Sequence, residues 1–330
     1  MNILFGNAPV RNSFSSFILI GLMALCAGSA FAGDWRRHTS PETDVWHNGF
    51  FISEKKGWLI SHNSGLILQT ADGGESWKIQ ARVATGYLES IFFRDEKNGW
   101  LAGDRGRIYR TEDGGDNWVL YDSFNKSNAF YVVRFFNRRR GFAAGIDSVN
   151  RKGIFVASDD GGVSWRSRAG EIGVSESLAD AAYFFGDKRG ILFGLKTTVQ
   201  TENGGREWRI YKTNQSGTTL RGLFFINSKI GWAVGHQGLV LQTNDGQTWT
   251  RQRSFSKGML RSVVFINKKV GYIAGNRDEN NFALWKTGDG GKTWAAQGTG
   301  FPNLRRLILT KNKLWLIGEA GTILSLSIKN

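Results

Sequence analysis

A short segment that ends in tryptophan recurs six times along this chain, and its spacing constrains the fold more than any other feature. The first copy, residues 70–77, reads Thr-Ala-Asp-Gly-Gly-Glu-Ser-Trp. Each copy starts with Ser or Thr, has Asp or Asn third and Gly fourth, and ends in Trp; the fifth copy is one residue shorter. Self-similarity at a fixed period of about 42 residues indicates a repeat architecture. The third residue and the tryptophan of the copies are Asp72 and Trp77, Asp113 and Trp118, Asp160 and Trp165, Asn203 and Trp208, Asp245 and Trp249, and Asp289 and Trp294.

Each repeat also contains three short apolar runs before this segment and one after it. In the fifth repeat the first three cover residues 220–225, 231–235 and 238–241. Runs of four to six residues rich in β-branched and aromatic types, bounded by glycine, are typical of strands. The chain has 43 Gly and 13 Trp but only 3 Pro, which suits short strands joined by tight turns. Four strands in a repeat of this length form one propeller blade, so the sequence predicts an all-β propeller.

The two ends of the chain predict the number of blades. Residues 307–309, 314–318 and 321–324 are three strands of a seventh repeat that lacks the tryptophan segment. Near the N-terminus, residues 33–36 look like an isolated fourth strand, and Trp35 precedes Trp77 by one repeat length. We therefore predict one domain, residues 33–330, in which the N-terminal strand completes the seventh blade. Such closure removes the exposed sheet edges that promote aggregation.

Residues 1–32 are expected to be an export signal that is removed. Arg11 is its positive charge, residues 17–27 its apolar core, and Ala30-Phe31-Ala32 a cleavage site. Export predicts the periplasm, or the thylakoid lumen of a photosynthetic cell. No later segment is apolar enough to span a membrane.

The only cysteine, Cys26, lies in this signal, so the mature chain can form neither disulfides nor thiolate metal sites. Lipid attachment at Cys26 is an alternative that the bulky Leu25 disfavours.

The recurring segment is interpreted as a structural turn rather than a catalytic group. Its hydroxyl and carboxylate can bond backbone groups of a tight turn, and its glycines permit positive φ. The tryptophan is expected to pack between neighbouring blades. Asn203 in place of Asp, and the shorter copy at Asp245, are compatible with a turn but not with an acid used in catalysis.

These repeats resemble the Asp-box, or BNR-like, repeats of sialidase-type proteins. The fifth repeat, with Leu220-Arg221-Gly222-Leu223-Phe224-Phe225, Gly231-Trp232-Ala233-Val234-Gly235 and Gly238-Leu239-Val240-Leu241, is similar to the photosystem II assembly and stability factors. Those proteins are lumenal seven-bladed Asp-box propellers. The resemblance implies a non-enzymatic scaffold, without a cofactor, that recognises a reaction-centre precursor through a basic surface. Relatives of this type also occur in non-photosynthetic bacteria.

The sequence does not point to an enzyme. Sialidases need an arginine triad and a Phe/Tyr-Arg-Ile-Pro segment, and none of the three prolines lies in such a segment. The four histidines, His38, His47, His62 and His236, lack the spacing of a metal motif, so we predict no catalytic residue and no metal site. A glycan-active propeller remains the alternative, because glycosidases use paired carboxylates and the chain has 28 acidic residues. Isolated loop acids that could serve are Asp104, Asp147, Asp180 and Glu319.

The positive charge of the chain predicts an acidic partner. The formal net charge is +15, one unit less once Arg11 leaves with the signal. Arg221, Arg261 and Arg305 share one position, four residues before the last aromatic or apolar residue of the first strand, in blades five to seven. The equivalent residues in the other blades are read as His47, Glu89, Val132 and Ala181.

Guanidinium groups in an arc suit carboxylates or phosphates. We therefore predict that Arg221, Arg261 and Arg305, with Arg306, bind an acidic or polar segment of a membrane-associated client protein. An anionic glycan is the alternative ligand, and an exported protein rarely meets nucleic acid. Arg138, Arg139 and Arg140 are a second basic patch on the opposite face. Three loops that depart from the repeat, residues 146–152, 168–177 and 276–281, are expected on the face that carries the arc.

Overall fold

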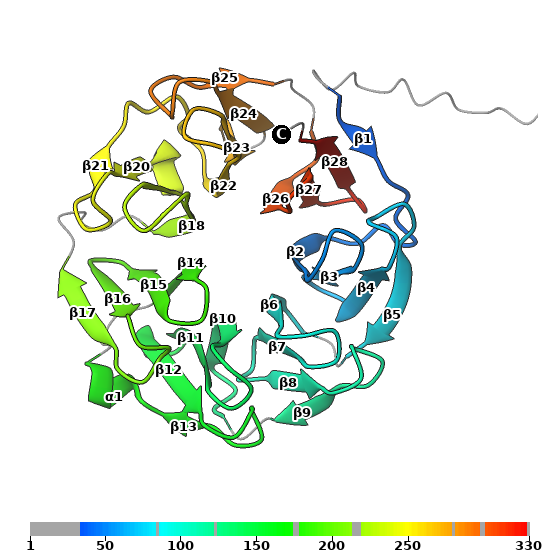
Figure 1. The fold of residues 1–330 in the computed structure, drawn as a ribbon, viewed down its shortest axis with the longest axis vertical. Coiled ribbons are helices and arrows are strands. Elements are labelled where there is room, and N and C mark those ends of the chain that lie inside the picture. The colour runs from blue at the N-terminus through cyan, green and yellow to red at the C-terminus, as the bar shows by residue number, and fades with distance from the viewer. Residues whose placement is uncertain are drawn as a thin grey trace, which may run out of the picture. The chain divides into compact units, whose positions relative to one another are not determined.

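Seven four-stranded antiparallel sheets are arranged around a central channel (Figure 1). The computed structural model describes residues 34–83, 86–121, 124–173, 178–212, 219–278, 281–297 and 301–328, with the side chains of residues 179 and 180 excepted. The described residues contain almost no helix. The prediction of an all-β, seven-bladed propeller is confirmed. The expected export signal, residues 1–32, and Gly33 lie outside the described residues.

The first strand of each blade lines the channel and the fourth lies at the rim (Figure 1). The strands of blades one to three are β2 (Trp46–Phe51), β3 (Gly57–Ser61), β4 (Leu66–Thr70), β5 (Lys78–Arg82), β6 (Leu88–Phe93), β7 (Gly99–Gly103), β8 (Ile108–Thr111), β9 (Val119–Tyr121), β10 (Asn128–Phe135), β11 (Gly141–Asp147), β12 (Lys152–Ser158) and β13 (Arg166–Ser167). Helix α1 (Ala169–Ile172) leads to blade four, which consists of β14 (Leu178–Phe185), β15 (Arg189–Gly194), β16 (Thr197–Thr201) and β17 (Arg209–Lys212).

Blades five to seven follow the same order. Blade five is β18 (Leu220–Phe225), β19 (Gly231–Gly235), the 3-10 turn η1 (His236–Gly238), β20 (Val240–Thr243) and β21 (Thr250–Arg251), and blade six is β22 (Leu260–Phe265), β23 (Gly271–Asn276), β24 (Phe282–Thr287) and β25 (Ala295–Ala296). The C-terminal strands of blade seven are β26 (Leu304–Leu309), β27 (Lys313–Gly318) and β28 (Ile323–Ser327), and its rim strand is β1 (Arg36–Arg37) from the N-terminus.

The ring closes through this N-terminal strand. Arg36 pairs with Ser325 and Arg37 with Leu324, and the backbone N–H of His38 donates to the Ile323 carbonyl at 2.9 Å. The predicted completion of the seventh blade is therefore confirmed, although the strand begins at Arg36, just after the tryptophan, rather than at Gly33. Trp35 packs against the cluster between blades six and seven, as the repeat spacing requires.

Buried side chains form seven clusters among the described residues, one at each junction between neighbouring blades. At four of the junctions a second-strand tryptophan stacks on the last phenylalanine of the next blade's first strand. For Trp315 and Phe51, between blades seven and one, the ring centroids are 5.0 Å apart, and the other three pairs are closer. The ring centroids are 3.6 Å apart for Trp58 and Phe93, 3.7 Å for Trp100 and Phe135, and 3.5 Å for Trp232 and Phe265. The tryptophan that ends the next recurring segment packs edge-on against the same phenylalanine.

The recurring segment forms a turn held by its own side chains. In blade one, the Gly74 N–H donates to Thr70 Oγ1 at 2.8 Å, and the Ser76 N–H donates to Asp72 Oδ1 at 3.0 Å. Gly74 has a φ of +85°, and a Cβ there would stand 2.0 Å from the Trp315 ring of the neighbouring blade. The second glycine of this turn therefore lets the chain turn and lets the adjacent blade approach. In blade four, Asn203 takes the place of Asp and accepts from the Glu207 N–H at 2.9 Å.

An Asp113→Asn variant is expected to lose stability at neutral pH but not in acid. The backbone N–H and the side chain of Asn117 donate to Asp113 and lower the pKa of this carboxyl to about 2. A carboxyl with a lowered pKa in the folded state stabilises the fold above its unfolded pKa, and this stability is lost as pH falls toward 2. The group is mostly exposed, so the loss at pH 7 should be under about 1 kcal/mol. Thermal unfolding of both proteins between pH 7 and pH 2 measures it.

The reciprocal variant Asn203→Asp is the control. It should add a smaller acid-sensitive contribution in blade four, because the Glu207 N–H can donate to the new carboxylate but the Glu207 side chain cannot. A difference between wild type and Asp113→Asn that stays constant down to pH 2 would contradict this account of the turn.

Among the described residues, no helix has the length and apolar character needed to cross a membrane.

Candidate functional site

The innermost strands carry a β-bulge near their first residues, and this bulge positions the candidate site. The pairing register skips one residue between the innermost strand and its neighbour in six blades. In blade four the shift covers residues 179–181. A bulge leaves one residue out of the ladder and redirects its side chain. The skipped residues of the other six blades are His47, Glu89, Tyr131, Arg221, Arg261 and Arg305.

The sequence alignment of blades three and four was wrong by one residue. Val132 and Ala181 were expected to match the arginine position, but both are buried, at 8% and 1% exposure. Strand β10 pairs Phe135 with Gly141, as β2 pairs Phe51 with Gly57, so Tyr131 is the equivalent residue in blade three. The pairs Phe135-Phe136 and Phe184-Phe185 lie at the ends of the first strands of these two blades, and the alignment matched the second phenylalanine where the first is the equivalent residue. In blade four the equivalent position is residue 180, whose side chain lies outside the described part.

The bulge residues line a cavity of about 330 Å³ at the end of the channel where the innermost strands begin. We call this end of the ring the mouth face. The structure brings the four predicted arginines together here, all of them half-buried. The residues that line this mouth cavity are His47, His62, Tyr87, Glu89, Tyr131, Arg221, Arg261, Arg305 and Arg306.

Within a blade, the bulge residue contacts the residue that follows the second strand. Arg221 Nε donates to His236 Nε2 at 3.3 Å, and Arg305 Nη2 donates to Glu319 Oε1 at 2.9 Å. Glu319 also accepts from Asn303 Nδ2 at 2.6 Å, so this acid is paired rather than isolated. Burial, then the charge of Arg221, lowers the pKa of His236 and keeps it neutral at pH 7. These contacts orient the guanidinium groups at the mouth.

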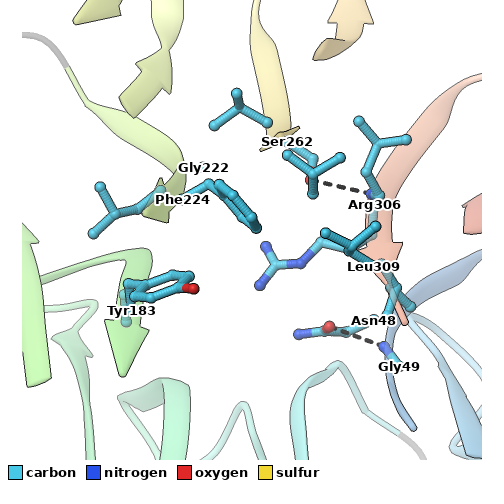
Figure 2. Close-up of a pocket in the computed structure, with 14 residues that line it drawn as sticks. Asn48, Gly49, Tyr183, Gly222, Phe224, Ser262, Arg306 and Leu309 are labelled. Atoms are coloured by element: carbon cyan, nitrogen blue, oxygen red, sulfur yellow. Dashed lines mark hydrogen bonds between the residues drawn. The ribbon is translucent and has the colours of Figure 1, made fainter. Parts of the chain in front are cut away.

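Arg306 differs from the other three arginines because it also lines the channel itself. Figure 2 shows its guanidinium extending into the channel between Asn48 and Phe224, opposite Tyr183. This channel cavity has a volume of about 380 Å³, and Arg306 is the only charged residue among the described residues that line it. Arg306 therefore extends the positive charge of the mouth into the ring.

A further cation lies in the channel, and the sequence analysis did not single it out. Arg134 and Arg306 both line an adjoining cavity of about 170 Å³. The Arg134 guanidinium carbon is 4.2 Å from the ring centroid of Phe92 and 5.2 Å from that of Phe184. Burial lowers the pKa of Arg134 to about 10, so it keeps its charge at neutral pH. Nothing in the spacing of the repeat marks this position.

Among the described residues that line the mouth cavity, the acidic one is Glu89. Glu89 Oε2 is 2.8 Å from His47 Nε2, and Glu89 Oε1 is 3.9 Å from His62 Nδ1. Burial alone would raise the pKa of Glu89, but the hydrogen bond from His47 and the charge of Arg221 lower it below its ordinary value. Burial, then the neighbouring His47, lowers the pKa of His62 to about 4. At pH 7 the site therefore has an ionised Glu89 beside a neutral His62.

The sequence does not reveal this group, because its members come from separate parts of two different blades. The alignment of the blades placed His47 and Glu89 at equivalent positions of adjacent blades. This was the one sign in the sequence that the two side chains could lie close together. His62 follows the second strand of blade one, and only the bulges bring that position beside the first strand. The prediction of no metal site rested on spacing along the chain alone.

The second basic patch lies away from the mouth face. Arg139 and Arg140 each bond Asp159 in the turn of their own blade, at 3.1 Å and 3.3 Å. Arg138 lines a different cavity, of about 360 Å³, with Arg94 and Arg110. The first glycine of the recurring turn, Gly161, donates to the Arg139 carbonyl, so these arginines lie beside the turns rather than at the mouth.

The other isolated acids are held in local contacts. Asp147 is half-buried and accepts from the Val149 N–H and the side chain of Asn150. Burial raises the pKa of Asp104, which lies beside Arg105. The three irregular loops follow second or fourth strands, and this topology puts their described parts on the mouth face. Residues 174–177 and 279–280 of these loops lie outside the described residues.

This fold and this site define a seven-bladed β-propeller with a basic channel mouth. The sequence model of the family described as photosynthesis system II assembly factor YCF48 matches residues 29–118, which cover blade one and most of blade two. The resemblance predicted from the repeats is thus confirmed over that part of the chain. Comparison with curated proteins finds no sequence match.

Solved structures share the fold over nearly the whole chain. A structure described as YCF48 bound to D1 peptide is 16% identical, covers 92% of this chain and 99% of its own, and has a TM-score of 0.69. YCF48 from Cyanidioschyzon merolae is 18% identical, with coverages of 90% and 99% and a TM-score of 0.68. A GH74 xyloglucanase from Xanthomonas campestris is 14% identical, covers 88% of this chain but 53% of its own, and has a TM-score of 0.66.

Proposed function

We propose that this protein is an exported, non-catalytic assembly factor that binds an acidic segment of a membrane-associated client protein at its mouth face. The observation that carries the proposal is the convergence of Arg221, Arg261, Arg305 and Arg306 on one cavity. Residues 1–32 would direct export to the periplasm, or to the thylakoid lumen in a photosynthetic cell. The protein would act by holding the segment while the client is assembled.

The chemistry of the cavity favours carboxylates. A guanidinium presents paired N–H donors that match the two oxygens of a carboxylate. Arginines from three consecutive blades can engage successive acidic residues of an extended peptide. Glu89 and Glu319 offset part of this charge, so the mouth region keeps a positive excess. The net charge of +15 would also speed the approach of an acidic partner.

The comparisons support a protein client. One solved structure with this fold is described as bound to a D1 peptide, and the matching family is described as an assembly factor. We extend the peptide-binding role to this chain, without extending the identity of the peptide.

The alternative is a propeller that cleaves or binds anionic glycans, as the fold likeness to a xyloglucanase leaves open. Glycoside hydrolysis uses two carboxyl groups about 5–9.5 Å apart across the cleaved bond. Among the described residues that line the mouth cavity, Glu89 is the one carboxylate, and the channel cavity has none. This distribution favours binding over hydrolysis.

Reversal of the three bulge arginines, as Arg221→Glu, Arg261→Glu and Arg305→Glu together, is expected to weaken the binding of an acidic peptide by at least about 30-fold, or about 2 kcal/mol. The remaining binding should depend less on salt, because fewer charge contacts are left. The probe is a fluorescent ten-residue peptide of alternating Glu and Ser, measured by fluorescence polarisation at low and moderate ionic strength.

The matched control reverses Arg138, Arg139 and Arg140 to Glu, which changes the net charge equally on the other face. It should change the affinity less than threefold. Equal losses in both variants would show attraction by net charge alone, and an unchanged affinity in the mouth variant would overturn the proposed surface. Incubation with polygalacturonate tests the alternative, since new reducing ends would indicate a glycosidase.

A further inference from the structure

Three side chains with metal-ligating atoms meet at one side of the mouth cavity. They are the imidazoles of His47 and His62 and the carboxylate of Glu89, and each offers one ligand atom within 4.8 Å of the other two. None of them comes from a metal-binding motif along the chain. His47 and Glu89 occupy the bulges of adjacent blades, and His62 follows strand β3.

The surrounding contacts hold this arrangement. Asn48 Nδ2 donates to the backbone carbonyl of Glu89 at 2.9 Å and so ties the two bulges together. The His62 N–H donates to the Val45 carbonyl at 2.9 Å, and the His62 ring stacks on Tyr87 with centroids 4.4 Å apart and planes 9° apart. The three groups are therefore positioned by backbone contacts and stacking, as a binding site requires.

The distances are close to those of ligands that share one ion. Zinc binds imidazole nitrogens and carboxylate oxygens at about 2.0–2.2 Å, so two of its ligands stand about 3–4 Å apart. His47 Nε2 and His62 Nδ1 lie 2.8 Å and 3.9 Å from the nearer Glu89 oxygens. The Nδ1 atom of His62 is buried, and no hydrogen bond to it is found among the described residues. A separation of 3.9 Å is too long for such a bond.

We propose that His47, His62 and Glu89 form a binding site for a divalent transition metal ion, Zn²⁺ in the first place. Two imidazoles and one carboxylate are a donor set that zinc takes together with one open coordination position. Mg²⁺ prefers an octahedron of oxygen ligands, so this set selects against it. Residues 27–330 contain no cysteine, so imidazole is the main ligand that this part of the chain offers to such metals.

The nearby arginines define what the open position would accept. Arg261 and Arg305 line the same cavity as His62, and both repel a cation. Glu89 offsets one unit of the positive charge of the arginines and the metal ion, and an anion at the open coordination position would offset another. The site is therefore expected to bind zinc more tightly with a carboxylate present. Binding of the metal itself does not depend on the proposed client.

Zinc titration of the full chain after treatment with a chelator tests the site. Calorimetry, with competition from a chromogenic chelator, should give one Zn²⁺ per chain with a Kd of about 10 µM or tighter. The single variants His47→Gln, His62→Gln and Glu89→Gln should each weaken binding by at least about 30-fold, since loss of an outer-shell partner alone costs 10–100-fold. Millimolar Mg²⁺ should not compete. The matched control His236→Gln, on the same face but outside the triad, should change the affinity less than threefold.

Absorption of Co²⁺ in the wild-type protein gives a second readout that needs no variant. Visible bands of a four- or five-coordinate ion are expected at one equivalent, and Zn²⁺ should displace them. Absence of saturable binding tighter than about 100 µM, or equal losses in His236→Gln and the triad variants, would overturn the proposal. Because the metal is titrated without peptide, and the peptide assay can be run with a chelator, failure of one proposal is distinguishable from failure of the other.

Discussion

A chain that begins at Thr39 is expected to melt more than about 10 °C below the chain that begins at Asp34. The missing residues include strand β1 (Arg36–Arg37), which is the rim strand of blade seven, and Trp35, which packs on the cluster between blades six and seven. Their loss also removes the buried hydrogen bond of 2.8 Å between His38 and Ser325. In a domain of this size, about 1 kcal/mol shifts the melting temperature by about 2–4 °C, so such a shift means a loss of several kcal/mol.

The same truncation exposes strand β28 (Ile323–Ser327) as an open edge, and open edges pair with other chains. Size-exclusion chromatography should therefore show dimers or larger species along with the lower melting temperature. Arg36→Ala is the control, because it removes only the exposed ion pair to Glu75 and keeps the strand. That variant should differ from wild type by less than about 1 kcal/mol. A truncated chain as stable as the longer one would mean that the ring does not depend on its closing strand.

A Trp100→Ala variant is expected to lose about 3–5 kcal/mol of unfolding free energy. The Trp100 side chain is 2% exposed and stacks on Phe135 of the next blade, with ring centroids 3.7 Å apart and planes 14° apart. Its Nε1 donates to the Gly161 carbonyl at 3.1 Å, and this hydrogen bond joins blade two to the turn of blade three. Alanine would leave a cavity between the two blades and an unpaired buried carbonyl. Urea unfolding with an unchanged m-value measures the loss.

Trp100→Phe is the natural control, because Phe142 occupies the equivalent position in blade three. It should keep the aromatic packing, lose the indole hydrogen bond, and cost less than half as much as alanine. A loss under about 1 kcal/mol for Trp100→Ala would contradict the view that these stacks join the blades.

The architecture was predictable because the features that stabilise it repeat. Each blade needs its own turn and its own interlocking tryptophan, so both appear in the sequence at regular spacing. Trp35 without the earlier strands of its own repeat, and a last repeat without its tryptophan, were enough to predict how the ring closes. That prediction depended on counting repeat units, and it needed no knowledge of contacts between distant residues.

The site was predictable only in part. The arginines at one aligned position do meet at the mouth cavity, but the alignment failed in blades three and four, where an extra aromatic residue follows the first strand of blade three and ends that of blade four. The bulges were not visible in the sequence, because the inserted residue can be of almost any type. His62 joins Glu89 through the fold of two adjacent blades, and Arg134 enters the channel from a position with no counterpart of its kind in the other blades. Such contacts are set by backbone irregularities that hydrophobic periodicity does not encode.

The bulges also bear on how such a protein could change its preference for ligands. The six described bulge residues are histidine, glutamate, tyrosine and three arginines, all on one kind of backbone irregularity. The stacked aromatic rings that join the blades lie at other positions of the same strands. A lineage could therefore retarget the mouth one blade at a time, by single substitutions that leave the melting temperature nearly unchanged. Relatives with this ring should diverge first at the bulges and last in the aromatic stacks.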